Sequence, residues 1–274
     1  MTDSSFSLNI DNRVPALIPT HNASALLVHN FKIMKNVGAD KLIYPIVVDD
    51  RSTEDIRGLC SNYDFGYIRI DHDFDFNYSI NMNTAAKILY DRSVRTAIFL
   101  NNDCYVYDKE KLKNFIDKHR AYRSNLSAPK LIYPPSPYSF KRHQPDENKI
   151  QFGGGYFINN DVGLPAHNGR FLDRSDIRFN VDREDTWVTG AFNIIDLDSF
   201  FECGGYDENL TCSYQDVLLS IQFLIRKKKI FYIGENVDFY HDEATTRAEI
   251  SLRNEGADRI RYVEILKNIL KGNP

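Results

Sequence analysis

Short apolar runs alternate with segments of helical periodicity through the first half of the chain. The predicted buried strands span residues 16–19, 43–48, 67–70 and 97–100. The segments with apolar residues at helical spacing are 23–37, 79–90 and 108–119. With a short helix expected after the second strand, four β-α units follow one another. This order predicts a parallel sheet with helices on both of its faces.

Small and polar residues mark the expected helix ends in this half. Ser52, with Asp55 three residues later, has the spacing of a weak capping box and predicts the N-cap of the short helix. Asp108 is expected to cap the helix that extends to about His119. Gly38 is expected to close the first helix.

The second half of the chain is less regular. The segment Pro134-Pro135-Ser136-Pro137 and the polar residues 141–149 predict a mobile loop, and Gly153-Gly154-Gly155 predicts a turn or hairpin. The remaining predicted elements are a strand over 187–195, a helix over 213–227, a strand over 230–233, and a C-terminal amphipathic helix with Ile260, Val263, Leu266 and Leu270 at core-like spacing.

The composition is typical of a soluble globular protein, with 42% hydrophobic and 26% charged residues among 274. The formal net charge of −4 provides no overall basic field, so nucleic acid is not an expected partner.

The chain opens with polar residues and has no apolar stretch of about 18 residues, so we expect a cytoplasmic protein without a transmembrane segment. This expectation is compatible with peripheral contact between the protein and the inner face of a membrane. The four cysteines lack C-x-x-C spacing, which argues against a zinc cluster.

Carboxylates directly follow two of the predicted strands. The run 43–48 leads into Asp49 and Asp50, and the run 97–100 leads into Asn101-Asn102-Asp103. Open α/β sheets bind their ligands at the carboxyl ends of their strands. Two acidic strand ends in one half of the chain therefore predict a nucleotide site with a metal ion beside it. A dinucleotide fold is disfavoured, because no G-x-G-x-x-G follows the first strand.

Eight short motifs occur along the chain in a characteristic order. Those of the first half are Ile18-Pro19-Thr20-His21-Asn22, Val47-Val48-Asp49-Asp50-Arg51-Ser52-Thr53-Glu54, Phe76-Asn77-Tyr78-Ser79 and Phe99-Leu100-Asn101-Asn102-Asp103. Those of the second half are Trp187-Val188-Thr189-Gly190-Ala191, Gly204-Gly205-Tyr206-Asp207-Glu208, Tyr214-Gln215-Asp216-Val217 and Tyr240-His241. In this order the chain resembles family 2 glycosyltransferases of the GT-A fold, in particular the rhamnosyltransferase-like and galactosyltransferase-like members. The resemblance covers residues 16–247.

The resemblance implies an α/β protein with one GT-A (Rossmann-like) domain over residues 1–274. Its sheet would be mixed and mainly parallel, with helices flanking it and one further helix at the C-terminus. Within the domain, residues 14–103 would bind the nucleotide and residues 104–247 would build the acceptor site. Residues 248–274 would form the C-terminal helix.

The resemblance also implies a set of residues around the nucleotide sugar. Asp49 would accept a hydrogen bond from uracil or a similar base. For Asp50, a role in ending the strand and capping the next helix is equally well supported. The implied residues at the nucleotide sugar are Thr20, Asn22, Asp49, Asp50, Asn77, Asn83 and Asn102.

Asp103 matches the last position of the D-x-D-like motif of the family and would bind a divalent metal, with His241 as a second ligand. Mg²⁺ is commonly held by one or two carboxylates plus substrate phosphates, whereas an imidazole ligand shifts the preference toward Mn²⁺. The chain departs from the family here, because Asn101-Asn102-Asp103 keeps a single carboxylate. Judged by residue type alone, His241 is more often a structural histidine.

Asp216 occupies the position of the catalytic base, although the usual Glu-Asp pair is Gln215-Asp216 in this chain. A carboxylate at that position would take the proton of the acceptor hydroxyl as the new bond forms. Trp187 and Gly190 are implied at the acceptor site. A core role for Trp187, the only tryptophan, is equally well supported.

Together these features imply an inverting glycosyltransferase. It would move a sugar from a nucleoside diphosphate sugar, with a UDP-sugar favoured, to a hydroxyl of a carbohydrate or lipid-linked oligosaccharide acceptor in polysaccharide biosynthesis. Two alternatives stay open. The acceptor could be a protein or a modified nucleic-acid base, which the basic stretches Lys141-Arg142-His143 and 226–229 would support. The chain could also be a nucleotide-sugar-binding homologue without catalysis. The sequence leaves the oligomeric state open.

Overall fold

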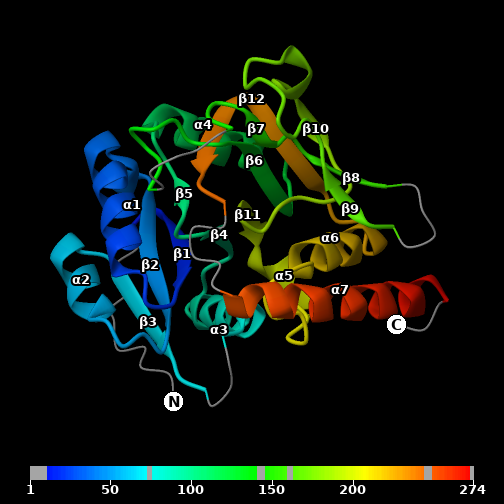
Figure 1. Ribbon diagram of the computed structural model, residues 1–274, viewed down its shortest axis with the longest axis horizontal. Coiled ribbons are helices and arrows are strands. Elements are labelled where there is room, and N and C mark those ends of the chain that lie inside the picture. The colour runs from blue at the N-terminus through cyan, green and yellow to red at the C-terminus, as the bar shows by residue number, and fades with distance from the viewer. Residues whose placement is uncertain (1–10, 73–75, 141–145, 159–162, 244–248, 272–274) are drawn as a thin grey trace.

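The four apolar runs of the first half form neighbouring parallel strands (Figure 1). The structure is a computed structural model and describes residues 11–72, 76–140, 146–158, 163–243 and 249–271. Strands β1 (Val14–Thr20), β2 (Ile43–Asp50), β3 (Gly66–Ile70) and β4 (Thr96–Leu100) lie in the order β4-β1-β2-β3. Every adjacent pair in this half is parallel, as the β-α pattern predicted.

The remaining strands complete a mixed sheet flanked by helices, except for β8 and β9, which pair only with each other in a separate two-stranded sheet. The other strands are β5 (Cys104–Tyr105), β6 (Leu126–Ile132), β7 (Ile150–Phe152), β8 (Gly155–Phe157), β9 (Pro165–His167), β10 (Asp182–Glu184), β11 (Phe192–Asp196) and β12 (Ile230–His241). The α-helices are α1 (Ser24–Val37), α2 (Ile56–Tyr63), α3 (Tyr78–Asp91), α4 (Lys109–Ala121), α5 (Leu197–Glu202), α6 (Gln215–Ile225) and α7 (Glu249–Leu270), and 3₁₀ turns occur at Ala39–Lys41 and Ile177–Phe179.

Strand β11 joins the two halves of the sheet. It is antiparallel to β4 on one side and to β6 on the other, and β12 is parallel to β6. Strands β4, β6 and β12 therefore run in the same direction as β1 and β2. Their carboxyl ends meet at one edge of the sheet, and the chain enters β11 from that same edge.

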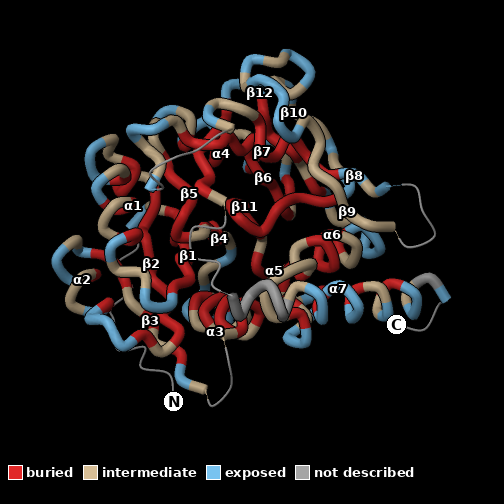
Figure 2. Tube along the Cα trace, in the orientation of Figure 1, coloured by how far each residue is buried: buried red, intermediate tan, exposed pale blue. Residues whose placement is uncertain are grey.

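The hydrophobic core is continuous from the first strand to the last helix. One cluster of buried side chains extends from Val14 to Leu266, and Figure 2 shows the buried trace running through the central strands. Aromatic rings link the two halves, because Phe99 of β4 packs edge-on against Phe200 and Phe192 of β11 packs against Phe239 of β12. The C-terminal helix therefore shares the core of the sheet.

Two predicted strands have different bounds in the structure. The expected strand 187–195 is confirmed only as β11, because the backbone N–H groups of Val188 and Gly190 donate to side chains of α6 instead of to a neighbouring strand. The expected strand 230–233 extends to His241 as β12. Its pairing with β6 shifts register between Ile233 and Asp238, where a polar segment interrupts the apolar pattern.

Two further expectations are corrected by the contacts. The N-cap of α2 is Asp55, whose side chain accepts from the N–H of Gly58, and not Ser52. On α7, Ile260 is 65% exposed, while Tyr262 and Leu266 face the core. The side chain of Leu270 lies outside the described residues.

The glycine-rich segment forms a hairpin element as predicted, because Gly155 begins β8, which pairs with β9. The basic segment 226–229 follows α6, while Lys141-Arg142-His143 lies outside the described residues. The described part of the chain, which includes all four cysteines, shows no disulfide bond between them.

The N-cap of α4 provides a test of this local structure away from the sheet edge. The Asp108 carboxylate accepts from the N–H groups of Glu110 and Lys111 at 2.8 and 3.1 Å. We expect Asp108→Ala to lower the free energy of unfolding by about 1 kcal/mol, because two amides at the helix start lose their acceptor. Urea denaturation measures this change. Asp108→Ser should retain most of the stability, and equal losses in both variants would contradict the capping role.

Candidate active site

The predicted polar residues gather at the carboxyl edge of the sheet. Thr20 and Asp49 end β1 and β2 and are partners in the parallel register. The segment 101–103 follows β4, and His241 ends β12. Parallel strands bring their carboxyl ends to the same edge, so residues that are far apart in sequence become neighbours there.

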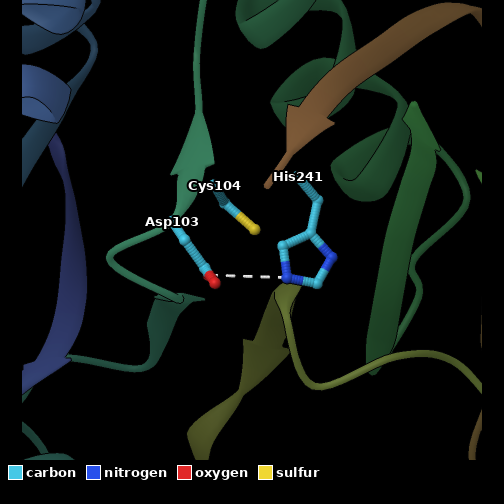
Figure 3. A group of neighbouring side chains, drawn as sticks. All are labelled: Asp103, Cys104 and His241. Atoms are coloured by element: carbon cyan, nitrogen blue, oxygen red, sulfur yellow. Dashed lines mark ion pairs between the residues drawn. The ribbon is translucent and has the colours of Figure 1, made fainter. Parts of the chain in front are cut away.

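Asp103 and His241 face each other at this edge (Figure 3). The Oδ1 atom of Asp103 lies 3.4 Å from Nε2 of His241, and the two side chains are 6% and 8% exposed. The other ring nitrogen of His241, Nδ1, lies 3.2 Å from Oε1 of Gln151. An amide oxygen only accepts hydrogen bonds, so Nδ1 is the donor in this contact, and Nε2 is the ring nitrogen that faces Asp103. The pair suits a divalent metal with oxygen and nitrogen ligands.

Cys104 lies beside this pair, with its Sγ, Asp103 and His241 within 4.8 Å of one another. Its thiol donates to the carbonyl oxygen of Ala191 at 3.3 Å. Burial, and then the negative charge of Asp103, raise the pKa of the Cys104 thiol well above its ordinary value. Asp103, Cys104 and His241 thus form a buried group with three possible metal-ligand atoms, two of which belong to the ligands that the resemblance implied.

Asp216 approaches the same edge from the first turn of α6. Its Oδ2 accepts from the N–H of Gly190 at 2.7 Å, and its Oδ1 accepts from the N–H of Val217 at 2.8 Å. A side chain on residue 190 would place Cβ only 3.2 Å from the Cβ of Asp216, so glycine permits this close approach. The next residue, Ala191, accepts from the N–H of Asn101 at 2.8 Å. Segment 190–191 thus connects Asp216 to the loop that carries Asp103.

Asp49 and Asp50 are buried, and both have partners within the protein. Asp49 accepts from the N–H of Ser52 at 3.0 Å, from the hydroxyl of Tyr67 at 2.7 Å and from Arg69 at 3.2 Å. A base that contacted Asp49 directly would compete with these bonds.

The Asp50 carboxylate contacts three side chains near the end of β2. Its Oδ1 lies 2.8 Å from Nε of Arg51 and 3.3 Å from Nε2 of His72, and its Oδ2 accepts from Asn81 of α3 at 2.8 Å. These contacts exclude the helix-cap interpretation of Asp50, because α2 is capped by Asp55.

Thr20, Asn22 and Asn102 line the ends of β1 and β4. The amide nitrogen of Asn102 lies 3.4 Å from the hydroxyl of Thr20. Asn22 is exposed and accepts from the N–H of Thr53 at 2.8 Å, while its own N–H donates to Ser52 at 2.9 Å. These bonds fasten the β1–α1 loop to the β2–α2 loop, beside the end of β2.

Asn77 and Asn83 contact the loop before α6 in the described structure. Asn77 caps α3 by accepting from Ile80 at 3.0 Å and donates to the carbonyl oxygen of Glu208 at 2.9 Å. Asn83 donates to the carbonyl oxygen of Tyr206 and accepts from its N–H, both at 2.9 Å. Both side chains thus have partners that hold this loop against α3.

Trp187 is 2% exposed and belongs to the core. Its ring packs against Phe152 and His167, and its Nε1 donates to the carbonyl oxygen of Tyr156 at 3.1 Å. Of the two roles that the sequence left open, burial favours the core role over stacking on a sugar.

Sequence reasoning missed two residues that support this site. Asn30 is fully buried on α1, and its amide nitrogen donates to the carbonyl oxygens of Asn102 and Cys104 at 2.9 and 2.8 Å. The sequence could have indicated this role, because Asn30 is a polar residue on the same helix face as the apolar Leu27, Phe31 and Met34. Gln151 had no such signal, because its contact with His241 joins two different strands.

A surface hollow of about 610 Å³ opens at the opposite edge of the sheet, near the amino ends of β1 and β2. Its lining includes Arg13, Lys41, Lys113 and Arg120, and it contains none of the predicted site residues. No helix within the described residues combines the length and apolar character that a membrane crossing needs.

Comparison with known protein families identifies the class of this fold and site. The glycosyl transferase family 2 model matches residues 16–179, which is more than half of the chain. The chain belongs to glycosyl transferase family 2. A comparison with curated proteins found no match.

Solved structures share the fold at low sequence identity. The structure of GalNAc-T7 with UDP, GalNAc and Mn²⁺ has a TM-score of 0.64 at 14% identity, covering 94% of this chain and 48% of that one. Residues 1–349 of TarS from S. aureus have a TM-score of 0.54 at 15% identity, covering 84% and 60%. The chain thus spans about half of the first protein and three fifths of the second structure. These neighbours establish the GT-A fold that the sequence predicted.

The contacts of Asn30 lead to a test of how the Asp103 loop is held. We expect Asn30→Ala to lower the free energy of unfolding by about 1–3 kcal/mol, because two carbonyl groups lose a buried donor. Asn36→Ala, on the exposed side of the same helix, is the matched control. Urea denaturation of both variants measures the difference. Equal stability of the two variants would show that the Asn30 bonds contribute nothing.

Proposed function

We propose that the protein transfers a sugar from a nucleoside diphosphate sugar to a hydroxyl group, with inversion at the anomeric carbon. The observation that carries this proposal is the gathering of Asp103, His241 and the Asp216–Gly190 contact at one sheet edge of a family 2 domain. The favoured donor is a UDP-sugar. The presence of UDP in the GalNAc-T7 structure supports this choice.

The donor nucleotide would lie along the ends of β1, β2 and β4. In this arrangement Thr20, Asn22 and Asn102 face the base and ribose, while Asp49 and Asp50 shape the loops around them. Partial support comes from the bonds that join the two loops, Asn22 to Thr53 and Asn22 to Ser52. Because Asp49 already bonds to Tyr67 and Arg69, its main contribution would be to fix the loop at 51–52.

Asp103 and His241 would hold the divalent metal. A carboxylate oxygen and an imidazole nitrogen 3.4 Å apart fit a shared cation, and Gln151 supplies the outer contact that orients the ring. When bound, such an ion offsets the negative charge that develops on the diphosphate leaving group. Mn²⁺ is the favoured ion because of the imidazole, and its presence in the GalNAc-T7 structure agrees with this choice.

Asp216 would act as the general base. The N–H groups of Gly190 and Val217 orient its carboxylate, and its place in the first turn of α6 favours the ionised form. The carboxylate takes the proton of the acceptor hydroxyl while that oxygen attacks the anomeric carbon from the side opposite the diphosphate. One base suffices for this displacement, which inverts the anomeric centre.

The favoured acceptor is a carbohydrate or a lipid-linked oligosaccharide. The alternative of a protein or nucleic-acid acceptor rests on two basic stretches, of which only 226–229 is described, at the end of α6 farthest from Asp216. A binding protein without catalysis would not need the contact between Asp216 and Gly190. Loss of transfer in an Asp216 variant distinguishes the enzyme from this last alternative.

The base assignment leads to a direct test. We expect Asp216→Asn to lower sugar transfer by about 10²–10⁴-fold, because the amide cannot take the hydroxyl proton. Nucleotide affinity should stay unchanged, since Asp216 lies on the acceptor side of the edge. Nucleotide release from a panel of nucleotide sugars, with Mn²⁺ present, measures transfer. Turnover equal to the wild type would remove Asp216 from this role.

The metal assignment can be tested by binding alone. Calorimetry with UDP should show weaker binding after chelation, and Asp103→Ala with Mn²⁺ should bind as weakly as the chelated wild type. Gln151→Met removes the partner of His241 and should lower Mn²⁺ affinity by about 10–100-fold. Asp108→Ser, far from the edge, is the control. Equal UDP affinity with and without metal would argue against this site.

A further inference from the structure

The C-terminal helix inserts one buried carboxylate into the loop that precedes α6. Asp258 of α7 is 2% exposed. Its Oδ1 accepts from the N–H of Thr211 at 3.0 Å, and its Oδ2 accepts from the N–H groups of Cys212 and Ser213 at 2.8 and 2.9 Å. A single side chain thus satisfies three consecutive backbone amides.

Three amides that converge on one carboxylate constrain the backbone strongly. Successive N–H groups that point to the same side form a concave anion-binding arrangement, and bonds from amides to an ionised carboxylate are stronger than neutral ones. Buried backbone amides also need partners, because an unsatisfied one destabilises the fold. The conformation of residues 211–213 therefore depends on a residue that is 45 positions or more away in the sequence.

The opposite side of the same loop is held by α3. The N–H of Tyr78 donates to the carbonyl oxygen of Thr211 at 2.8 Å, and Asn77 donates to the carbonyl oxygen of Glu208 at 2.9 Å. Figure 1 shows α7 extending beside α5 and α6. The loop is thus fixed between α3 and α7.

Only two residues separate this loop from Asp216. Tyr214 adopts a left-handed conformation with φ of +65° at the N-cap of α6, and its ring stacks on Tyr262 of α7 at 5.0 Å between centroids. A bulky residue in this conformation is strained and needs surrounding contacts to hold it. Asp258 and Tyr262 lie one helical turn apart on the same face of α7, so the helix holds both the loop and the turn into α6.

We propose that Asp258 is a positioning residue for Asp216. It touches no substrate in this arrangement. It sets the backbone that leads into α6 and thereby directs the Asp216 carboxylate toward Gly190. The catalytic part of this proposal rests on the proposed function of Asp216, whereas the structural part, the holding of residues 211–213, stands on the hydrogen bonds alone.

Asp258→Asn tests the proposal with little change in shape. Asparagine offers one acceptor oxygen in place of two, so its NH₂ group must face at least one backbone N–H. Glu264→Gln removes a negative charge from an exposed position of the same helix and is the matched control. Asp258→Glu keeps the charge but moves it by one methylene, and it serves as a second variant if Asp258→Asn does not fold.

The experiment combines amide hydrogen exchange with kinetics on the full chain. In Asp258→Asn, the amides of residues 211–213 should exchange at least about tenfold faster, while those of β1 and β4 keep wild-type rates. The kcat for nucleotide release from a UDP-sugar should fall by about 10²-fold, because a small displacement of the base is enough for such a loss. The KM for the donor should stay within about twofold, because Asp258 lies outside the donor side of the edge. Glu264→Gln should match the wild type in each measurement.

Each part of the proposal can fail separately. Unchanged exchange at residues 211–213 in a folded Asp258 variant would show that the carboxylate does not hold the loop. Faster exchange there with wild-type kcat would show that the loop does not position the base. If Asp216→Asn keeps full transfer, the proposed function of Asp216 fails, and the exchange measurement still decides whether Asp258 holds the loop.

Discussion

The placement of β11 between β4 and β6 determines where the candidate site residues lie. Because β11 is antiparallel to both neighbours, the strands on its two sides run in the same direction. The carboxyl ends of β4 and β12 then reach one edge, which brings Asp103 to 3.4 Å from His241. The chain enters β11 at this edge through Gly190, which contacts Asp216. One antiparallel strand thus assembles groups from four parts of the chain.

The carboxylates that this structure places around the sheet edge and the loop before α6 fall into two groups. Asp49, Asp50 and Asp258 accept hydrogen bonds from backbone or side-chain donors of neighbouring loops and helices and thereby hold these segments in place. Asp103 and Asp216 lie at the edge where we propose that substrate binds, although Asp216 also accepts from the N–H groups of Gly190 and Val217. In sequence, Asp49 and Asp50 resemble Asp103, because all three lie at or just after the carboxyl end of a strand. Hydrogen bonds to a charged group contribute about 1.5–3 kcal/mol each, so loop fixation is a sufficient reason for burying these acids.

The fold follows from the sequence to a large extent, and the site only in part. The apolar runs and helical spacing located β1 to β4, α1 to α4 and α6 within a few residues, and the motif order agreed with the family, whereas α5 had no sequence prediction. The bounds of β11 and β12 were wrong, because side chains of α6 take the N–H groups of Val188 and Gly190, and because β12 resumes pairing after a register shift. The nucleotide-side residues stay predictions, and Asn77 and Asn83 have loop-holding contacts that spacing could not indicate.

The sequence by itself determined the type and order of most elements, because periodicity records which face of each segment is buried. It also located the acidic strand ends. Only the tertiary structure decided which acids have hydrogen-bond partners within the protein and which of them lie near one another at the sheet edge. The partners of Asp50, His241 and Asp258 come from segments 31, 90 and up to 47 residues away, and only the packing of strands, helices and loops in three dimensions brings those segments together. Local sequence patterns carry no information about such contacts. The same aspartate residue can accept hydrogen bonds from backbone amides or bind a metal ion, and the sequence does not distinguish these two roles.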